Sequence, residues 1–343
     1  MGGRIRRGRP PRTTSRRASG PATHGNPAMN WQAMNWRRYF WPVVGIAAVI
    51  FSLLLLWHEL RGISLDDVWD GISAISAPGW ILAALCSVIA YASLAGYDHI
   101  ALLHIGKKVS WLFVTLCSFT TYALSHNIGG SVFSGAVIRY RAYGTRGLSG
   151  QDVGVLVAIC WITFVLSTIL ASGLVLVFEP EILDRFSGIA HHGLSKAAGI
   201  AMLIVVAAYI FGSWLHLRPL KIAGFQLHYP ALPIVARQLL IGPIELLAAA
   251  AIIFFALPAA HNPGYFVVLG VFLVSFSIAQ ISHAPGGLGV FEVVFLAGLS
   301  DMDPVGVLAA LLVFRLFYLI IPLFLGLGIV LLFERSQFSR TES

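Results

Sequence analysis

Charged residues are scarce in this sequence. Only 11% of its 343 residues are Asp, Glu, Lys or Arg, whereas 57% are hydrophobic. A soluble domain averages about 25% charged residues, so this composition excludes an ordinary soluble domain and indicates an integral membrane protein.

Cysteine is also rare, and its placement excludes two kinds of site. Cys86, Cys117 and Cys160 all lie inside apolar stretches and have no metal-ligand spacing. We therefore interpret them as small core hydrophobes, without a disulfide or a metal site. The sequence also has no motif that pairs a nucleophile with a base, so it predicts neither an enzyme nor a cofactor.

The net charge of +8 is concentrated before the first apolar run, in an arginine-rich segment at residues 1–38. Such a segment predicts a basic, disordered cytoplasmic tail. Because no aromatic-rich module accompanies the arginines, we expect no nucleic-acid partner. Contact with anionic lipid headgroups is the better alternative.

Long apolar runs occupy most of the remaining chain and predict an all-α polytopic membrane domain at residues 39–335. A short cytoplasmic C-terminal tail is expected at 336–343. The fold predicted is about seven full spans plus two re-entrant, broken-helix hairpins in an inverted repeat. The expected full spans include 40–57, 80–105, 152–178, 197–216, 231–257 and 305–333.

The first interrupted run is 122–141. The apolar arm before it, 111–124, would be roughly 21 Å long as a helix, which is short of a bilayer core of roughly 30 Å. A cluster of small and polar residues follows, and unpaired polar groups in hydrocarbon cost several kcal/mol each. We therefore expect 111–135 to enter, break at 126–130 and return to the side from which it came.

The basic residues around this run decide between a hairpin and a span. Lys107 and Lys108 precede it, and Arg139, Arg141 and Arg146 follow it. The positive-inside rule places such residues in the cytoplasm, which a hairpin allows and a full span does not. With this hairpin, both chain termini are expected in the cytoplasm.

A second interruption occupies 282–292 and contains His283, Pro285, Gly286, Gly287 and Glu292. Proline removes a helical hydrogen bond, so we expect the run 265–281 to dip in from outside and break here. Two broken hairpins from opposite faces are typical of transporters whose half-helices line a substrate site near the midplane. The alternative is that Gly and Pro merely help the helices to pack.

Both interruptions carry a family resemblance. The segments S-H-N-I-G-G-S-V-F-S-G-A-V-I-R-Y-R-A-Y (125–143) and H-A-P-G-G-L-G-V-F-E (283–292) resemble those of the lysylphosphatidylglycerol synthase transmembrane-region family. Gly96-Tyr97-Asp98, followed by 108–111, also fits. That family includes the flippase part of the multiple peptide resistance factor and stand-alone inner-membrane proteins of the YbhN type. The similarity covers 40–335.

The resemblance implies a lipid-translocating domain in the bacterial inner membrane. The implied partners are anionic or modified phospholipids, aminoacylated phosphatidylglycerol among them, and a second copy of the chain or a separate lipid synthase. Full-length members continue into a soluble acyltransferase-like domain. Because this chain stops at Ser343, we do not expect it to transfer amino acids.

A polar groove with free backbone N–H groups suits a phosphate, and arginine matches phosphate oxygens. Arg139 and Arg141 are expected to gather the headgroup at the cytoplasmic mouth, or else to anchor the protein there. His126 and His283 are either satisfied by backbone carbonyls or contact the headgroup or relay protons. The expected substrate-binding residues are Ser125, His126, Asn127, Gly129, Gly130, Ser134, Arg139, Arg141, His283, Pro285, Gly286, Gly287 and Glu292.

Three further charged residues, Glu245, Glu292 and Arg315, fall at similar depth. We expect a buried ion pair between Arg315 and a glutamate, with Glu245 the named candidate, while Glu292 is an alternative site of proton exchange. Asp98 and His99 are expected to reach the inner interface.

Three functions compete with a flippase. The first is a lipid-modifying enzyme that uses His126, His283 and Glu292 as acid and base. The second is a solute or ion transporter, which would have an occluded central cavity, whereas a flippase needs a cleft open sideways to lipid. The third is a non-transporting partner of a lipid synthase.

Overall fold

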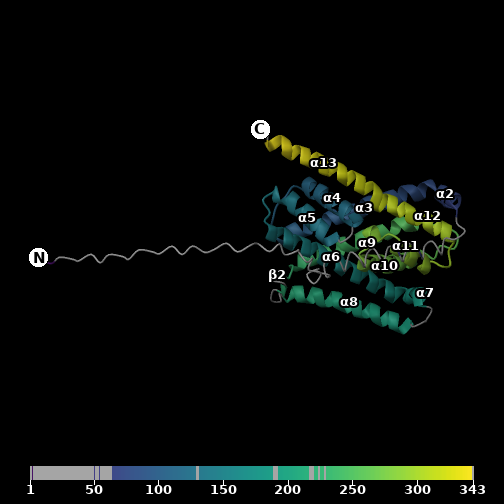
Figure 1. Ribbon diagram of the computed structural model, residues 1–343. Helices are drawn as coiled ribbons and strands as arrows, with labels where there is room; N and C mark the ends of the chain where they lie inside the picture. Colours follow the sequence, from purple (N-terminus) through teal and green to yellow (C-terminus); the bar gives the residue numbers. More distant parts are fainter. Residues whose placement is uncertain are drawn as a thin grey trace, which may run out of the picture.

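The structure is a computed structural model that describes residues 2, 50, 54, 64–128, 131–187, 192–215, 220–222, 225–227 and 229–341. These residues form a helical bundle with one small antiparallel strand pair (Figure 1). The predicted all-α polytopic membrane fold is confirmed. The elements are α2 (Leu65–Ser73), α3 (Ala77–His104), α4 (Trp111–Ile128), α5 (Ser131–Gly144), α6 (Gly150–Phe178), η2 (Pro180–Leu183), α7 (Asp184–Ser187), α8 (His192–Trp214), β1 (Leu220–Ile222), β2 (Phe225–Leu227), α9 (Leu232–Ala256), α10 (Tyr265–Ser282), η3 (Pro285–Gly287), α11 (Val290–Gly298), α12 (Pro304–Phe314), the π-helix η4 (Arg315–Ile320) and α13 (Ile321–Thr341).

In the part of the chain that the structure describes, six helices are long and apolar enough to cross a membrane. One of them combines α12, η4 and α13 up to Arg335. The expected span at 40–57 and the expected tail at 1–38 lie outside the described residues, so the number of about seven spans stays a prediction. Helix α13 continues to Thr341, into the expected tail at 336–343.

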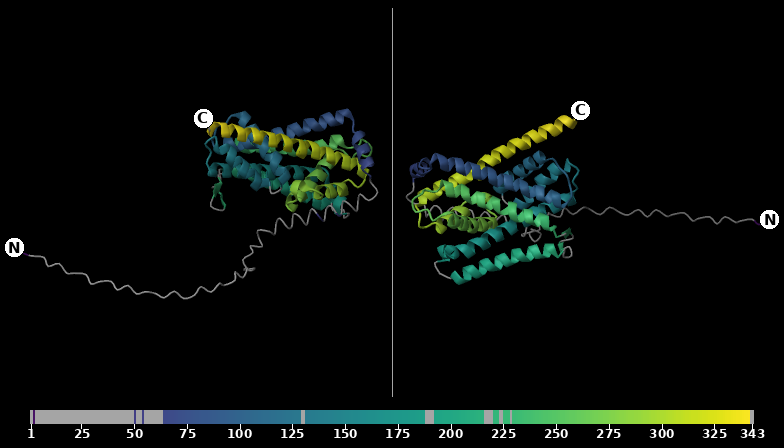
Figure 2. Two further views of the ribbon diagram at one scale, coloured as in Figure 1. Left: turned by 45° about the horizontal axis from the view of Figure 1, so that its top comes forward. Right: turned by 180° about the vertical axis from the view of Figure 1, so that it is seen from behind.

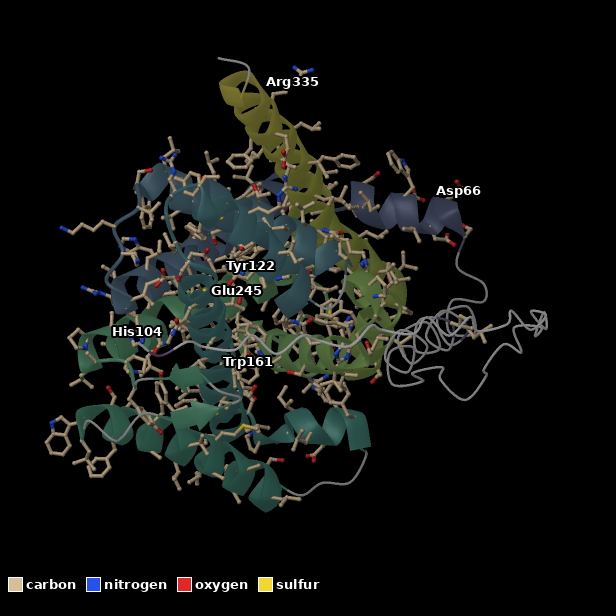
Figure 3. All side chains as sticks on the ribbon, turned by 60° about the vertical axis from the view of Figure 1, so that its left-hand side comes forward. Asp66, His104, Tyr122, Trp161, Glu245 and Arg335 are labelled. Carbon is tan, nitrogen blue, oxygen red and sulfur yellow. The ribbon has the colours of Figure 1, made fainter. Side chains whose placement is uncertain are left out.

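The two ends of the bundle carry opposite charge. One end, here called the basic end, contains the loop before α4 and the end of α5, with Lys107, Lys108, Arg141 and Arg146. The other, the acidic end, contains α2 and the loop before α12, with acidic residues such as Asp66 and Asp301. Asp66 and His104 label these opposite ends in Figure 3.

Helices α4 and α5 form an antiparallel hairpin. A Cβ added at Gly135 of α5 would lie 3.1 Å from Thr121 of α4, so the two helices touch closely near the turn. At the basic end, the ring of Tyr143 lies 5.9 Å from that of Phe113. The run 111–141 is therefore two helices that begin and end at the basic end. We name them hairpin 1, and the predicted return is confirmed.

Helices α10 and α11 form a second antiparallel hairpin, here called hairpin 2, which begins and ends at the acidic end. Gly298, at the end of α11, packs against Val271 of α10, where an added Cβ would lie 2.7 Å from a methyl carbon. Arg185 donates to the Gly298 carbonyl oxygen at 3.1 Å and to both oxygens of Asp301. The Arg185 hydrogen bonds to the Asp301 carboxylate lower the pKa of Asp301. The second predicted hairpin is thus also present.

Close helix contacts at glycine hold the centre of the bundle. A Cβ added at Gly96 of α3 would lie 2.8 Å from Ile241 of α9, and one added at Gly242 of α9 would lie 1.8 Å from the Ser167 hydroxyl of α6. Such small residues allow membrane helices to approach each other. Helix α8 packs mainly on α6 at one margin, whereas α13 lies on the opposite side of the molecule (Figures 1 and 2).

The short helix α2 carries two acidic residues, Asp66 and Asp67, in its first turn. Ser64 accepts from the Asp67 N–H, and the Asp67 carboxylate accepts from the Ser64 N–H at 2.7 Å, which is a reciprocal capping box. The Ser64 N–H and hydroxyl both donate to the Asp67 carboxylate and lower the pKa of Asp67. Gly71 faces α12, where a Cβ would lie 3.2 Å from Val305, so this glycine allows α2 to pack closely on the bundle.

Candidate functional site

The tip of hairpin 1 carries polar residues into the interior of the bundle. Helix α4 ends at Ile128 and α5 begins at Ser131. The Ser125 side chain is buried, and the His126 ring stacks on Tyr318 at 5.4 Å. Gly129 and Gly130 lie outside the described residues, so their predicted roles stay predictions.

Several residues at the tip of hairpin 2 have a left-handed backbone conformation. His283 ends α10 with φ 55° and ψ 17°, and Gly286, Gly287 and Gly289 all have positive φ. Glycine adopts this conformation readily, whereas a histidine there is uncommon. The Gly289 N–H donates to Glu292 Oε2 at 2.8 Å and so starts α11. The break between α10 and α11 therefore contains Pro285, Gly286 and Gly287, the residues from which it was predicted.

The two tips meet around a cavity of about 290 Å³. A Cβ added at Gly286 would lie 3.9 Å from the His126 carbonyl oxygen, which brings the backbones of the tips together. This tip cavity, as we name it, is lined by polar residues of both hairpins and of η4, and by aromatic residues of α6, α10, α11 and α12. The polar residues are Ser125, His126, Gln280, His283 and Arg315, joined by Tyr318.

The tip cavity reaches the surface of the bundle halfway along its length. Trp161, in the first half of α6, lines the cavity and is 52% exposed. Gln280 and His283 line it too and are exposed. Figure 3 places Trp161 in the middle of the molecule, away from the end that Asp66 marks. The cavity therefore opens sideways, through the face that hydrocarbon would cover.

Arg315 pairs with Glu292, which corrects the named expectation of a pair with Glu245. Arg315 Nε donates to Glu292 Oε1, and Nη1 donates to the Gly286 carbonyl oxygen at 3.3 Å. The depth estimated from position along each span is similar for the two glutamates, so it could not show which of them pairs with Arg315. The partner depends on which helix faces Arg315. Arg315 Nη2 is buried and has no hydrogen-bond partner among the described residues. The arginine thus retains a donor beside the cavity.

Glu245 instead bonds to Tyr318. Its Oε1 accepts from the tyrosine hydroxyl, while Oε2 has no partner in the part of the chain that the structure describes. Glu245 is 2% exposed and lines a smaller cavity of about 70 Å³ beside the tip cavity. Ser125, His126 and Gln280 line both cavities, so the two form one polar region. Figure 3 shows Glu245 near Tyr122, in the middle of the bundle.

Arg139 is not at an open mouth, contrary to our expectation, and Asp98 does not reach the interface. Arg139 is 4% exposed and Asp98 is fully buried. Two guanidinium nitrogens donate to the Asp98 carboxylate, with Nη2–Oδ1 at 2.6 Å, and the Tyr143 hydroxyl donates to it at 2.9 Å. The Arg139 guanidinium also lies over the Tyr122 ring, 4.8 Å from its centre. A buried charge needs such a partner, and Asp98 provides it.

The remaining predicted site residues have separate surroundings. Arg141 is exposed at the basic end and pairs with Glu334 at 2.7 Å. Asn127 donates to the carbonyl oxygens of Ala123 and Leu319, so its amide joins α4 to η4. Ser134 and Pro285 are not among the residues that line the tip cavity. Of the expected set, Ser125, His126, His283, Gly286 and Gly287 line it directly.

The π-helix η4 supplies two residues of the site, Arg315 and Tyr318. Pro322 follows it and has no N–H to give to a carbonyl oxygen four or five residues earlier. Side chains of α3 take that role: Ser87 donates to the Phe317 carbonyl oxygen at 2.7 Å, and Tyr91 to that of Tyr318 at 2.9 Å. A π-helix inside a longer helix is often found at functional sites.

Sequence reasoning missed Trp161, Gln280 and Tyr318. Gln280 could have been found from its place three residues before His283, just ahead of the break. Trp161 and Tyr318 have no such signal, because aromatic residues within spans are common packing residues. Among the described residues there is no cluster of three or more His, Cys, Asp or Glu side chains that would hold a metal ion.

Comparison with protein families agrees with the resemblance of the two tip segments. Residues 44–326 match the family described as the lysylphosphatidylglycerol synthase TM region. The match includes both hairpins, the tip cavity and most of the helices that surround it.

Individual relatives extend this match. The chain is 31% identical over 300 residues to the inner membrane protein YbhN of Escherichia coli, which covers 86% of this chain and 90% of that protein. It is 29% identical over 313 residues to the protein slr0712 of Synechocystis, covering 88% and 95%. It is also 26% identical over 295 residues to the phosphatidylglycerol lysyltransferase of Staphylococcus haemolyticus, covering 82% of this chain and 33% of that enzyme. This chain therefore spans about a third of the lysyltransferase.

Proposed function

Because this membrane protein belongs to the lysylphosphatidylglycerol synthase TM region family, we propose that it moves phospholipid between the two leaflets of a cell membrane. The lipid headgroup would occupy the tip cavity while the acyl chains stay in the bilayer. The basic end would face the cytoplasm, as the positive-inside rule requires.

The sideways opening of the tip cavity is the observation that carries this proposal. A lipid that crosses a bilayer keeps its acyl chains in hydrocarbon, so its headgroup needs a polar path that is open to the side. Gln280, His283 and Trp161 line the cavity and are exposed at that opening. A transporter of small solutes would enclose its substrate instead, and this cavity does not favour that alternative.

The chemistry inside the cavity suits a phosphodiester. A charged group at the bilayer centre is costly, and the cost falls when donors replace its water. Arg315 keeps Nη2 without a partner among the described residues, and His126 Nδ1 is likewise buried without one. The other Arg315 nitrogens are fixed by Glu292 and Gly286, so the guanidinium is already positioned to donate to a phosphate oxygen.

The two hairpins suggest how the cavity changes sides. Hairpin 1 enters from the basic end, hairpin 2 enters from the acidic end, and their tips share one cavity. In transporters built from inverted repeats, movement of one repeat against the other exposes a central site alternately to each face. We propose the same movement here, with the headgroup held between the tips.

The relatives suggest the class of lipid. The Staphylococcus haemolyticus relative is named a phosphatidylglycerol lysyltransferase, and this chain matches a third of that enzyme. We therefore propose phosphatidylglycerol, or its aminoacylated form, as the transported lipid. A phosphate that binds to Arg315 is compatible with either lipid.

The proposal is tested with purified protein in liposomes that contain phosphatidylglycerol with a fluorescent headgroup or chain. A membrane-impermeant quencher reports how much probe lies in the outer leaflet, and its time course gives the rate of lipid movement. We expect the protein to accelerate movement. His126→Leu should reduce the rate about tenfold or more, which is the effect of losing one hydrogen bond to a charged group.

His99→Leu is the matched control, because His99 packs on Trp111 and is not among the residues lining the tip cavity. It should move lipid at the rate of the wild-type protein. Equal rates in liposomes with and without the protein would contradict lipid movement, and an unchanged rate in a folded His126→Leu protein would remove the tip cavity from the mechanism.

A further inference from the structure

A second hollow lies apart from the tip cavity, between hairpin 1 and α13. It has a volume of about 440 Å³ and is lined almost entirely by apolar atoms. Phe113, Leu116 and Cys117 of α4 form one wall, and Ile329 and Val330 of α13 form the facing wall. None of its lining residues lines the tip cavity. We call it the lateral groove.

The groove exists because α13 touches α4 at one level and then leaves it. At the contact, a Cβ added at Gly326 of α13 would lie 3.2 Å from the Ala123 side chain. Beyond that contact, α13 runs outward toward the C-terminus, as Figures 1 and 2 show. The space between the separating helices is the groove, which widens toward the basic end.

Only one end of the groove carries charge. Arg141 lies at its rim, pairs with Glu334 at 2.7 Å, and has a side chain that is 66% exposed. Lys107, Lys108 and Arg146 lie at the same end of the bundle. At the opposite, inner end, the buried Thr120 lines the groove, and its hydroxyl has no partner among the described residues. The groove is thus an apolar slot whose rim carries the Arg141–Glu334 ion pair, both members of which line it.

The surroundings of the slot indicate which occupant it could take. Its walls are formed by α4 and α13, and α13 belongs to a segment that is long and apolar enough to cross a membrane. The apolar lining offers almost no hydrogen-bond partner to a polar ligand, whereas hydrocarbon chains need none.

We propose that the lateral groove binds one anionic phospholipid, with its acyl chains between α4 and α13 and its phosphate at Arg141. The phosphate replaces or shares the Glu334 partner of the guanidinium, which stays in the headgroup region. This is a bound lipid at the basic end, distinct from the lipid that would pass through the tip cavity. Its binding does not depend on whether the protein transports lipid.

Photocrosslinking with two probes tests the proposal. The full-length protein is placed in a phosphatidylcholine bilayer with a small fraction of phosphatidylglycerol or phosphatidylcholine that carries a photoreactive acyl chain. Labelled positions are then mapped by mass spectrometry. We expect labelling on the groove walls of α4 and α13. The phosphatidylglycerol probe should label them about fivefold more strongly, which corresponds to one basic side chain at the headgroup.

Arg141→Gln should abolish the difference between the probes. Arg335→Gln is the matched control, because Arg335 is exposed on α13 beside Glu334 but is not among the residues that line the groove. Ala142→Phe places a ring in the groove and should lower labelling by both probes. The control Ala201→Phe adds the same ring to an exposed position of α8 and should not.

Equal labelling by the two probes in the wild-type protein would overturn the assignment of an anionic lipid. An unchanged preference in Arg141→Gln would overturn the role of the rim. Labelling that is absent from the groove walls would overturn lipid as the occupant.

Discussion

Arg315 illustrates how one residue both stabilises the site and contributes to it. Its side chain is only 14% exposed, and its charge is matched by Glu292. Glu292 is itself held by the Gly289 N–H. A buried ion pair contributes little net stability, because removing two charges from water costs about as much as their attraction returns. What the pair provides is a fixed guanidinium with one donor left over.

This account predicts an asymmetry between single and double substitutions. Arg315→Gln leaves the Glu292 charge buried without its partner and should lower the free energy of unfolding by about 3–5 kcal/mol. The double variant Arg315→Gln with Glu292→Gln removes both charges and should recover most of that loss. Denaturation in mixed micelles measures both values.

Lipid movement by the same double variant separates stability from function. If the guanidinium binds the phosphate, the double variant should move lipid more slowly than the wild-type protein even though its stability is largely recovered. If the Arg315→Gln protein is as stable as the wild type, Glu292 does not depend on Arg315 to compensate its buried charge.

At the scale of the helix, the π-helix and Pro322 belong together. The turn from Arg315 to Ile320 is wide enough to point both Arg315 and Tyr318 at the cavity. Proline cannot donate, so carbonyl oxygens of η4 depend on side chains of α3. Tyr91 therefore serves as an external donor to the helix that carries the site, at 2.9 Å from the Tyr318 carbonyl oxygen.

A double-mutant cycle tests whether the stability contributed by the Tyr91 hydrogen bond depends on Pro322. Tyr91→Phe alone should cost about 1 kcal/mol of stability, which is the net value of a typical hydrogen bond. In a Pro322→Ala background the restored N–H can serve the same carbonyl, so the cost should fall to less than half. Thermal unfolding in detergent of the four proteins gives the coupling.

Ser87→Ala is the companion measurement, since Ser87 donates to the neighbouring Phe317 carbonyl oxygen. An equal cost of Tyr91→Phe with and without Pro322 would show that proline is not the reason for the external bond.

The helices that break were predictable from sequence, whereas the π-helix was not. Glycine and proline have backbone preferences that do not depend on tertiary packing. The break after Ser282 therefore follows from the residue types Pro285, Gly286 and Gly287 alone. The widened turn at Arg315 has no residue signal of its own, because it arises from packing between α3, α4 and the helix that carries it.

Across the whole molecule, the sequence predicted which segments return but not which charges meet. The number of residues along a span gives the depth of a side chain, and this placed Glu245, Glu292 and Arg315 at one level. It does not give the face of the helix, so it could not choose the partner of Arg315. The same limit hid the Asp98–Arg139 pair, whose members lie on α3 and α5.

Hairpin 1 determines how the whole bundle is placed in the membrane. Its return keeps Gly144 at the same end of the bundle as Lys107, and α6 then leads across to the acidic end. If the basic end faces the cytoplasm, every following crossing is fixed, and the loop with Ala260 must lie outside. The positive-inside rule supports this orientation.

Single cysteines test the orientation directly. Gly144→Cys and Ala260→Cys are both exposed positions in loops or at helix ends, and the three native cysteines are buried, which keeps background labelling low. In intact cells, a membrane-impermeant thiol reagent should label Cys at position 260 and not at 144. After the membrane is opened, both should react. Labelling of position 144 and not of position 260 in intact cells would reverse the orientation and place the lateral groove and its arginine rim in the outer leaflet. Labelling of both positions would mean that α6, α8 and α9 do not make three crossings between them.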